Sequence, residues 1–298
     1  MVKHAEELLR EEIIAHLKEL QGDSETVTRE QLWNFQIRGK TLRLIDWSRG
    51  IRNPKELDAT LTIMSNPKSQ YDDAEVDGSL FGYAYREGSS AGDNTKLRRA
   101  FELKLPLILL RKVSDGVFVP VSPVYVVADD AKNRQFLIAL DQNLQSVADP
   151  MDLLPIERKY AERAAKQRLH QPVFRARVLR AYESRCTVCR LAPLKLLDAA
   201  HIIADNKENG GPTVDNGLCL CKLHHAAYDA NYLGIRPDRT IVISQRLLDD
   251  PDDSQMLQFG LQARHEQPLY TPMRSKKELP SPDRLAERFA EFVTSEAS

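Results

Sequence analysis

The sequence predicts an α+β protein of two domains, and three observations support this fold class. The chain has 298 residues, 42% of them hydrophobic, which is enough for two domains with a core each. Apolar, β-branched segments separated by turn residues follow one another between residues 105 and 141. From residue 151 the pattern changes to charged residues at helical spacing, and all four cysteines lie between Cys186 and Cys221.

An amphipathic helix is predicted over residues 4–20. Apolar residues recur there at helical spacing with charged residues between them, so they form one stripe on the helix surface. The stripe consists of Leu9, Ile13, Leu17 and Leu20, and the helix is expected to end at Gly22. A second helix start is indicated at Thr28, where Gln31 completes a capping pattern.

The next hundred residues are expected to form a compact, mostly antiparallel β-barrel. The strand segments are 105–113, 117–128 and 135–141, separated by the turn sequences SDG and DDAKN. One short helix, from Thr95 to Leu103 with Asp93 or Asn94 as N-cap, interrupts the strands. A barrel closes so many short strands without leaving exposed edges.

A domain boundary is predicted at Pro150, which gives domains at residues 1–150 and 151–298. In the second domain, residues 235–250 indicate a strand and a turn. Residues 281–294 indicate a terminal amphipathic helix whose inner face carries Leu285, Phe289 and Phe292.

Residues 151–184 are expected to form a basic helical linker interrupted by Pro155 and Pro172. Between Glu157 and Arg180 the acidic residues are Glu157 and Glu162, whereas the basic ones are Arg158, Lys159, Arg163, Lys166, Arg168, Arg175, Arg177 and Arg180. A solvated helix face is the usual role of such a run, and phosphate contact is the alternative. The formal net charge of -1 for the whole chain does not decide between them.

No apolar run is long enough to cross a bilayer, and the first residues, MVKHAEELLREE, are charged where a secretory signal is apolar. We therefore expect a cytoplasmic protein with no membrane contact. In a reducing compartment, four cysteines confined to one segment indicate metal ligands rather than disulfides.

The cysteine spacing predicts a structural zinc site. Cys186 and Cys189 are separated by two residues, as are Cys221 and His224, and this spacing lets each pair share one tetrahedral ion. Cys219 points the same way as Cys221 along a strand and is an alternative ligand. We favour Cys221 because its partner lies three residues on, and we expect Cys219 to be a small buried residue.

Three further residues lie within this segment: His201 in DAAHI, Asn216 in DNGLCLC and His225 in HHAAYD. In order and interval they resemble the HNH nuclease family, a ββα-metal fold, with its core at residues 186–229. The resemblance implies that His201 is the general base, that Asn216 holds the loop and orients this histidine, and that His225 binds a divalent metal. Phosphodiester hydrolysis needs such a base and a hard cation such as magnesium or manganese.

The segment departs from the family at Ala200, where many members carry an acidic metal ligand. Asp198 lies on the same face of the expected strand and is the substitute we predict, with a local hydrogen bond at the strand end as the alternative. Asp229 is expected on the helix surface, with a supporting role behind the metal ligands as the alternative.

In the first domain, YDDAEVDGSLFGYAY, from Tyr71 to Tyr85, followed by NTKLRRAFEL and PLILLRKV, resembles the SRA domain, a PUA-like barrel that flips a modified cytosine out of DNA. The resemblance implies that Tyr71 and Tyr83 clamp the base and that Asp73 reads its polar edge, displaced by one position from Ala74. The free-energy cost of flipping a base out of the stack is offset by stacking between aromatic rings and by hydrogen bonds to the base.

The alternative for these tyrosines is a place in the barrel core, because alternating strand residues share one face. Trp33 and Trp47 are expected in the core, with a place in the base pocket as the alternative.

Together the resemblances imply a modification-dependent DNA endonuclease that recognises 5-methyl- or 5-hydroxymethylcytosine in double-stranded DNA and cuts nearby. Its cofactors would be structural zinc and catalytic magnesium or manganese. A single HNH site cuts one strand, so a double-strand break would require a homodimer or two binding events. The rival functions are a catalytically inactive reader of modified DNA and an HNH endonuclease without modification dependence.

Overall fold

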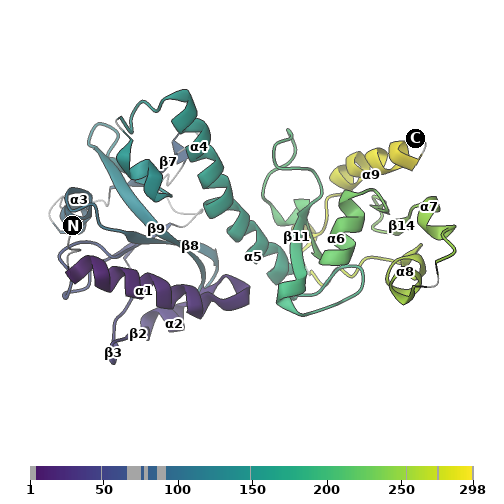
Figure 1. Cartoon of the computed structure of the whole chain (residues 1–298), viewed down its shortest axis with the longest axis horizontal. Helices are drawn as coiled ribbons and strands as arrows, with labels where there is room; N and C mark the ends of the chain where they lie inside the picture. Colours follow the sequence, from purple (N-terminus) through teal and green to yellow (C-terminus); the bar gives the residue numbers. More distant parts are fainter. Residues whose placement is uncertain are drawn as a thin grey trace. The chain divides into compact units, whose positions relative to one another are not determined.

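The computed structural model describes residues 5–47, 49–65, 75–76, 80–85, 92–147, 149–252, 254–273 and 275–296. The chain divides into two compact units, the first ending at Val173 and the second beginning at Phe174 (Figure 1). This division falls later than the boundary expected at residue 150. The reason is that helix α4 (Pro155–Ala165) buries Ala161 in a cluster with Leu80 and Leu137 of the first unit.

Helix α1 (Ala5–Gln21) confirms the first predicted helix, and its buried stripe includes Ile13 and Leu17. Arg10 is also fully buried on this helix and donates to Glu6 and to backbone carbonyls, including that of Thr60 at 2.7 Å. A buried guanidinium is tolerated only when its donors are satisfied in this way.

Helix α2 (Arg29–Trp33) begins with the predicted capping box. The Thr28 hydroxyl accepts from the backbone amide of Gln31, and the Gln31 side chain accepts from the amide of Thr28. Together these contacts satisfy two amides that the first helical turn would otherwise leave unpaired.

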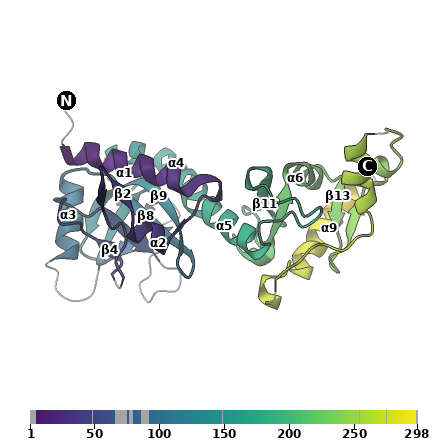
Figure 2. The ribbon, with the colours of Figure 1, turned by 90° about the horizontal axis from the view of Figure 1, so that it is seen from below.

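The described strands of the first unit form one mixed, curled half-barrel sheet (Figure 2). Strands β8, β9 and β10 confirm the three predicted segments. The order along the sheet is β4 (Ile51–Arg52), β5 (Thr62–Ser65), β8 (Leu107–Ser114), β9 (Val117–Asp130), β10 (Gln135–Ala139), β7 (Leu80–Ala84) and β6 (Glu75–Val76), and β1 (Val27–Thr28) also pairs with β9. All neighbours are antiparallel except β5 and β8.

Helix α3 (Asp93–Glu102) starts two residues earlier than expected, and its N-cap is Gly92 rather than Asp93 or Asn94. The Asp93 carboxylate accepts from the side-chain amide of Asn53 at 2.8 Å, so this side chain ties the helix start to another segment. A separate short hairpin consists of β2 (Gln36–Ile37) and β3 (Lys40–Thr41).

The helical linker was expected to break at both prolines, and this expectation is wrong for Pro172. Pro155 occupies the first turn of α4, where a missing amide costs nothing. A π-helical turn, Lys166–His170, then leads directly into α5 (Gln171–Ala181), which contains Pro172. The wider turn relieves the clash between a proline ring and the carbonyl four residues earlier.

Two arginines of the basic run are engaged by the protein itself. Arg168 donates to the carbonyls of Ser122, at 2.7 Å, and Leu140, and Arg175 donates to the carbonyl of Leu197 at 3.0 Å. These two residues stabilise their own units.

The second unit has its core around a β-hairpin and a helix, β11 (Leu197–His201), β12 (Gly217–Cys221) and α6 (Lys222–Asp229). The predicted strand near residue 235 is a second hairpin. The remaining elements of the second unit are β13 (Leu233–Ile235), β14 (Ile241–Ile243), α7 (Gln245–Leu248), α8 (Gln255–Gly260), α9 (Pro282–Glu296) and the 3₁₀ turns Leu194–Leu196, Val214–Asn216, Gln262–Arg264 and Lys276–Glu278. In the described residues of the first unit, the 3₁₀ turns are Gly22–Ser24 and Gln142–Ser146.

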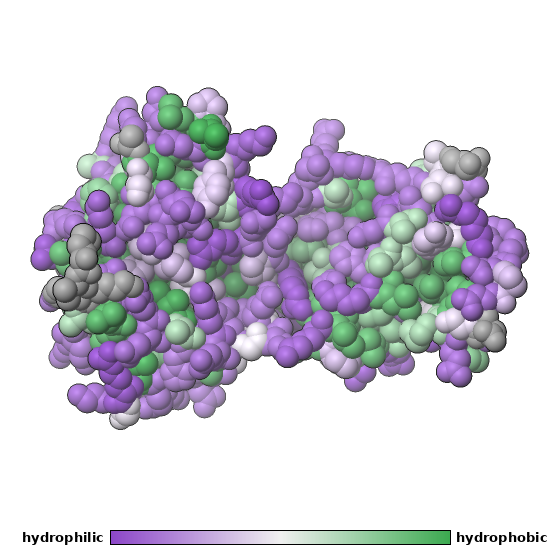
Figure 3. Space-filling model, in the orientation of Figure 1, coloured by the Kyte–Doolittle hydropathy of each residue, from purple (hydrophilic) through white to green (hydrophobic). Residues whose placement is uncertain are grey.

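Helix α9 confirms the predicted terminal helix, with Leu285 and Phe292 buried and Phe289 half-buried. On the visible face of the second unit, hydrophobic residues gather around α8, where Met256 and Phe259 are exposed (Figure 3). None of the helices in the described residues is both long and apolar enough to cross a membrane.

Candidate functional site

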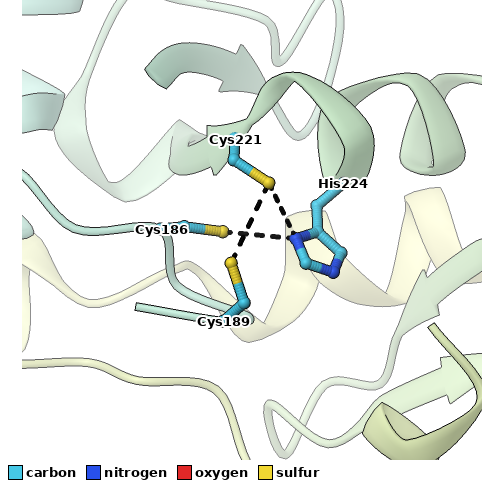
Figure 4. Close-up of side chains that lie close together, drawn as sticks. All are labelled: Cys186, Cys189, Cys221 and His224. Atoms are coloured by element: carbon cyan, nitrogen blue, oxygen red, sulfur yellow. Dashed lines mark hydrogen bonds between the residues drawn. The ribbon is translucent and has the colours of Figure 1, made fainter. Parts of the chain in front are cut away.

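Four side chains converge in the second unit: Cys186, Cys189, Cys221 and His224 (Figure 4). Their ligand atoms all lie within 4.8 Å of one another. Cys186 and Cys189 come from a tight turn in which the amide of Arg190 donates to the carbonyl of Cys186 at 2.8 Å. Cys221 ends β12, and His224 lies in the first turn of α6.

The ring of His224 is oriented for metal binding through Nδ1. Its Nε2 donates to the carbonyl of Gly260 at 2.7 Å, which leaves Nδ1 directed at the sulfur atoms of Cys221 and Cys186, 3.0 and 3.5 Å away. A histidine ligand is commonly fixed by such a hydrogen bond from its other nitrogen. Three thiolates and one imidazole at these distances fit a tetrahedral zinc ion.

The cluster also has the electrostatics of a metal site. Hydrogen bonds from Cys189 and Cys221 lower the pKa of Cys186. Burial disfavours the charged form of His224, but its hydrogen bonds to Cys186 and Cys221 outweigh burial and raise the pKa of His224 to about 10. A bound divalent cation would displace the protons that these side chains share, and it would balance the negative charge of the thiolates.

Cys219 does not belong to the cluster. It pairs with Ala199 across the β11–β12 hairpin and is fully buried in the core of the second unit. Burial raises the pKa of its thiol to about 12, so it stays protonated at neutral pH. Cys219 thus has the structural role expected for it, and Cys221 lies among the ligands.

His201 is the last residue of β11, and the ring of Phe174 on α5 lies parallel to it at 3.9 Å between centroids. Opposite His201 in the hairpin is Gly217. A side chain at Gly217 would collide with Val178 of α5, because a Cβ atom there would lie 2.4 Å from the nearest valine methyl group. Glycine therefore lets the hairpin approach α5 closely enough for Phe174 to hold the histidine ring.

Asn216 is fully buried and closes the loop between the two strands. Its side-chain oxygen accepts from the amide of Ile203 at 2.9 Å, and its nitrogen donates to the carbonyls of Ile203 and Gly211 at 2.9 and 3.1 Å. Because Ile203 lies two residues after His201, these bonds hold the backbone that carries the histidine. The geometry agrees with the loop-holding role that the sequence implied for Asn216.

Asp198 and His225 meet across β11 and α6. Oδ2 of Asp198 lies 3.1 Å from Nδ1 of His225, and Oδ1 accepts from the ammonium group of Lys222 at 2.5 Å. Burial opposes ionisation of Asp198, but the hydrogen bonds from Lys222 and His225 outweigh it and lower the pKa of the carboxyl. Asp198 is therefore ionised at neutral pH, and one of its oxygens faces the predicted metal-binding histidine.

Asp229 lies on the helix surface, as expected, with 69% of its side chain exposed, and its Oδ2 lies 3.5 Å from Nε2 of His225. The spacing of four residues on one helix was the available signal for this contact, because such residues share a helix face. Carboxylates thus flank both nitrogens of His225, Asp198 on one side and Asp229 on the other.

Two further residues near the site carry no sequence signal for their role. Phe174 is far from His201 in the chain, and only the packing of α5 on the hairpin brings their rings together. Arg284 of α9 donates to the Asp215 carboxylate at 2.6 Å and to the carbonyl of Asn209 at 3.0 Å. These bonds fasten the loop that precedes Asn216.

Of the predicted base-binding residues, Tyr71 and Asp73 lie outside the described residues. Tyr83 lies on β7, is 6% exposed, and donates from its hydroxyl to the carbonyl of Gly50 at 3.0 Å. Its strand neighbours Phe81 and Tyr85 are buried as well. This is the core position that the sequence left open as an alternative for these aromatic residues.

The expectation that Trp47 lies in the core is wrong, since this residue is 73% exposed. Trp33 is only half-buried. Both residues line a hollow of about 630 Å³ on the first unit, together with Arg29, Glu30 and Asn34.

The chain was compared with known proteins over its whole length and in parts. No curated protein matches the chain. Among solved structures, a protein described as a modification dependent TagI restriction endonuclease aligns over 91% of this chain and 94% of its own, with 17% identity and a TM-score of 0.30. A type IV phosphorothioation-dependent restriction endonuclease, ScoMcrA, aligns over 92% of this chain and 55% of its own, with 14% identity and a TM-score of 0.27.

A family model gives a more local result, and it covers the hairpin and helix that carry Cys221, His224, His201, Asn216 and His225. Residues 186–236 match the family described as HNH endonuclease, and this part of the second unit is an HNH endonuclease domain.

Proposed function

We propose that the protein is a modification-dependent DNA endonuclease in which the HNH domain hydrolyses phosphodiester bonds and the first unit recognises a modified cytosine. The observation that carries the nuclease part is the family match of residues 186–236, in which His201, Asn216 and His225 occupy β11, the loop end and α6.

In the proposed reaction His201 takes the proton of the attacking water. The ordinary pKa of histidine, about 6.5, suits a general base at neutral pH. Phe174 and the Asn216 loop keep this ring in one orientation, so the base is preorganised before substrate arrives.

Asp198 and His225 would hold a divalent ion, magnesium or manganese. Their facing atoms, Oδ2 of Asp198 and Nδ1 of His225, are 3.1 Å apart, so the two side chains converge on one point. Lys222 engages the other oxygen of Asp198, so the carboxylate keeps one oxygen for the ion. Such an ion supplies Lewis-acid stabilisation of the charge on the phosphate and the leaving oxygen.

The zinc cluster has a structural role in this proposal. Cys186, Cys189, Cys221 and His224 supply all four ligands of a tetrahedral ion, which leaves no position for substrate. His224 and His225 are adjacent on α6, so the zinc fixes the start of the helix that presents His225.

For the first unit we propose an SRA-like domain in which Tyr71, Asp73 and Tyr83 bind a flipped 5-methyl- or 5-hydroxymethylcytosine. What supports this is the sequence resemblance, together with the curled sheet of the first unit. A carboxylate such as Asp73 would accept from the exocyclic amine of cytosine.

The test is a plasmid and oligonucleotide cleavage assay with added magnesium or manganese. The DNA would carry unmodified cytosine, 5-methylcytosine, 5-hydroxymethylcytosine or its glucosylated form. We expect metal-dependent cutting of the modified DNA alone. Equal cutting of all four substrates would mean that the protein is an HNH endonuclease without modification dependence. Binding of modified DNA without cutting would mean that it is a catalytically inactive reader.

The ratio of nicked to linear plasmid tests the assembly. One HNH site per chain should give nicks first, and linear product should rise with protein concentration if two copies act together.

A further inference from the structure

We propose that Trp33, Trp47 and the residues around them form a nucleobase-binding pocket on the first unit, built from other residues than those proposed for the modified cytosine. We call this hollow of about 630 Å³, lined by Arg29, Glu30, Trp33, Asn34 and Trp47, the indole pocket. The occupant is one unstacked base of DNA. This inference rests on the proposed action on DNA.

The first argument is the exposure of Trp47. Tryptophan is on average one of the most buried side chains, and here 73% of its surface is accessible. The ring is nevertheless held in place, since Trp33 lies edge-on to it at 5.8 Å between centroids and the Arg29 guanidinium lies 5.2 Å from its centroid. A large aromatic surface that is both fixed and open to solvent is suited to stacking.

The second argument is charge. The guanidinium of Arg29 also donates to the carbonyl of Asp46 at 3.2 Å, which fixes its position beside Trp47. The guanidinium of Arg43 lies 4.2 Å from the centroid of Trp33, and this arginine is exposed. Two guanidinium groups beside two indoles suit a ligand that combines a flat ring with a phosphate.

The third argument is the polar edge of the pocket. Glu30 and Asn34 complete its lining, and both are exposed. A carboxylate accepts from the amino groups of cytosine, adenine or guanine, and a carboxamide both donates and accepts. Stacking surface, cations and base-edge partners thus come together in one hollow, as nucleotide recognition needs and as a purely apolar protein partner does not.

The chain's own composition provides the probe. Trp33 and Trp47 are the only two tryptophans in the sequence, so intrinsic tryptophan fluorescence reports on the indole pocket alone. We would titrate the full chain, without added divalent ion, with a single-stranded oligonucleotide, a duplex containing a one-nucleotide bulge and a fully paired duplex. We expect saturable quenching by the first two at lower concentrations than by the third.

Anisotropy of labelled DNA then tests the residues. Trp47→Ala should weaken binding of single-stranded and bulged DNA about tenfold, the loss expected for one base-stacking contact. Because Trp47 is exposed, this change leaves the core intact. Trp47→Phe should restore most of the affinity, and Phe101→Ala, which removes another exposed aromatic ring of the first unit, should have no effect.

The proposal is overturned if DNA does not quench the tryptophans, or if Trp47→Ala binds all three DNAs like the wild type. It is also overturned if Trp47→Ala weakens the paired duplex as much as the other two, because that result means contact with the backbone rather than with a base. Failure of the endonuclease proposal gives a different result. If the protein does not cut DNA with magnesium or manganese but shows the expected quenching, the proposal for the indole pocket stands and the endonuclease proposal falls.

Discussion

Oδ2 of Asp198 lies 3.1 Å from Nδ1 of His225, so a strand carboxylate and a helix imidazole face each other in the HNH domain. The family position for the acid is Ala200, and Asp198 reaches the histidine from the same face of β11. In the proposed site, Asp198 would replace the acid that the sequence lacks before His201 and would be the second ligand of the metal.

Replacement of Asp198 tests this arrangement. Asp198→Asn keeps the shape but removes the charge, so we expect metal-dependent nicking to fall by about 100-fold and the magnesium requirement to rise. The measurement is initial nicking rate against magnesium concentration, with Asp229→Asn as the matched variant. Normal activity in Asp198→Asn and inactivity in Asp229→Asn would place the ion on the Nε2 side of His225 instead.

His201→Ala should remove the general base. We expect the single-turnover cleavage rate to fall by about 10²- to 10⁴-fold while DNA affinity, measured by anisotropy, stays unchanged. His201 is one ring of a stacked pair, so a thermal melt should accompany the assay to exclude loss of fold. Loss of DNA binding in this variant would contradict the division of roles between the two units.

The zinc cluster predicts a difference between two neighbouring cysteines. Cys221→Ser should abolish the one zinc ion per chain measured by mass spectrometry, and the second unit should unfold, because structural zinc contributes directly to folding. Cys219→Ala is the matched control, since it removes a buried thiol outside the cluster and should keep the zinc at a cost of about 1 kcal/mol. Retention of zinc in Cys221→Ser would show that Cys219 can serve as the ligand.

Asp130 predicts an acid-sensitive component of stability in the first unit. Burial opposes its ionisation, but hydrogen bonds from the backbone and side chain of Asn133 and from Gln135 outweigh it, and the pKa of this carboxyl is lowered. A lowered folded-state pKa stabilises the protein above the unfolded pKa of about 3.9, and this contribution is lost as the pH falls through the folded-state pKa.

Asp130→Ala should therefore lower the free energy of unfolding by about 2 kcal/mol at pH 7 and by less near pH 3. Denaturant melts at the two pH values measure the difference. Equal destabilisation at both would mean that the charge of Asp130 is not what matters.

Features that depend on local spacing could be predicted from the sequence. The capping box joins Thr28 to Gln31, three positions later, and the stripe of α1 repeats within one helix, so both follow from helical geometry. The zinc ligands were predictable for the same reason. Cys186 and Cys189 lie in one turn and Cys221 and His224 in another, and only the contact between these two turns depends on the tertiary fold.

Features that depend on contacts between distant segments could not. The helix continues through Pro172 because a π-helical turn precedes this residue. Trp47 lies on the surface, although a large aromatic side chain is expected in the core. Two further contacts join elements that are far apart in the chain. Phe174 stacks on His201, and Arg284 donates to Asp215 in the loop before Asn216.

The sequence by itself determined the chemistry available to this protein, namely a zinc-binding set and the HNH residues at their intervals. Only the tertiary structure decided which partner each group has: Asp198 faces His225, Cys219 is excluded from the zinc cluster, and the two tryptophans line an open pocket. The physical reason is that helical and turn geometry act over a few residues, whereas burial and side-chain pairing are set by the packing of the whole unit.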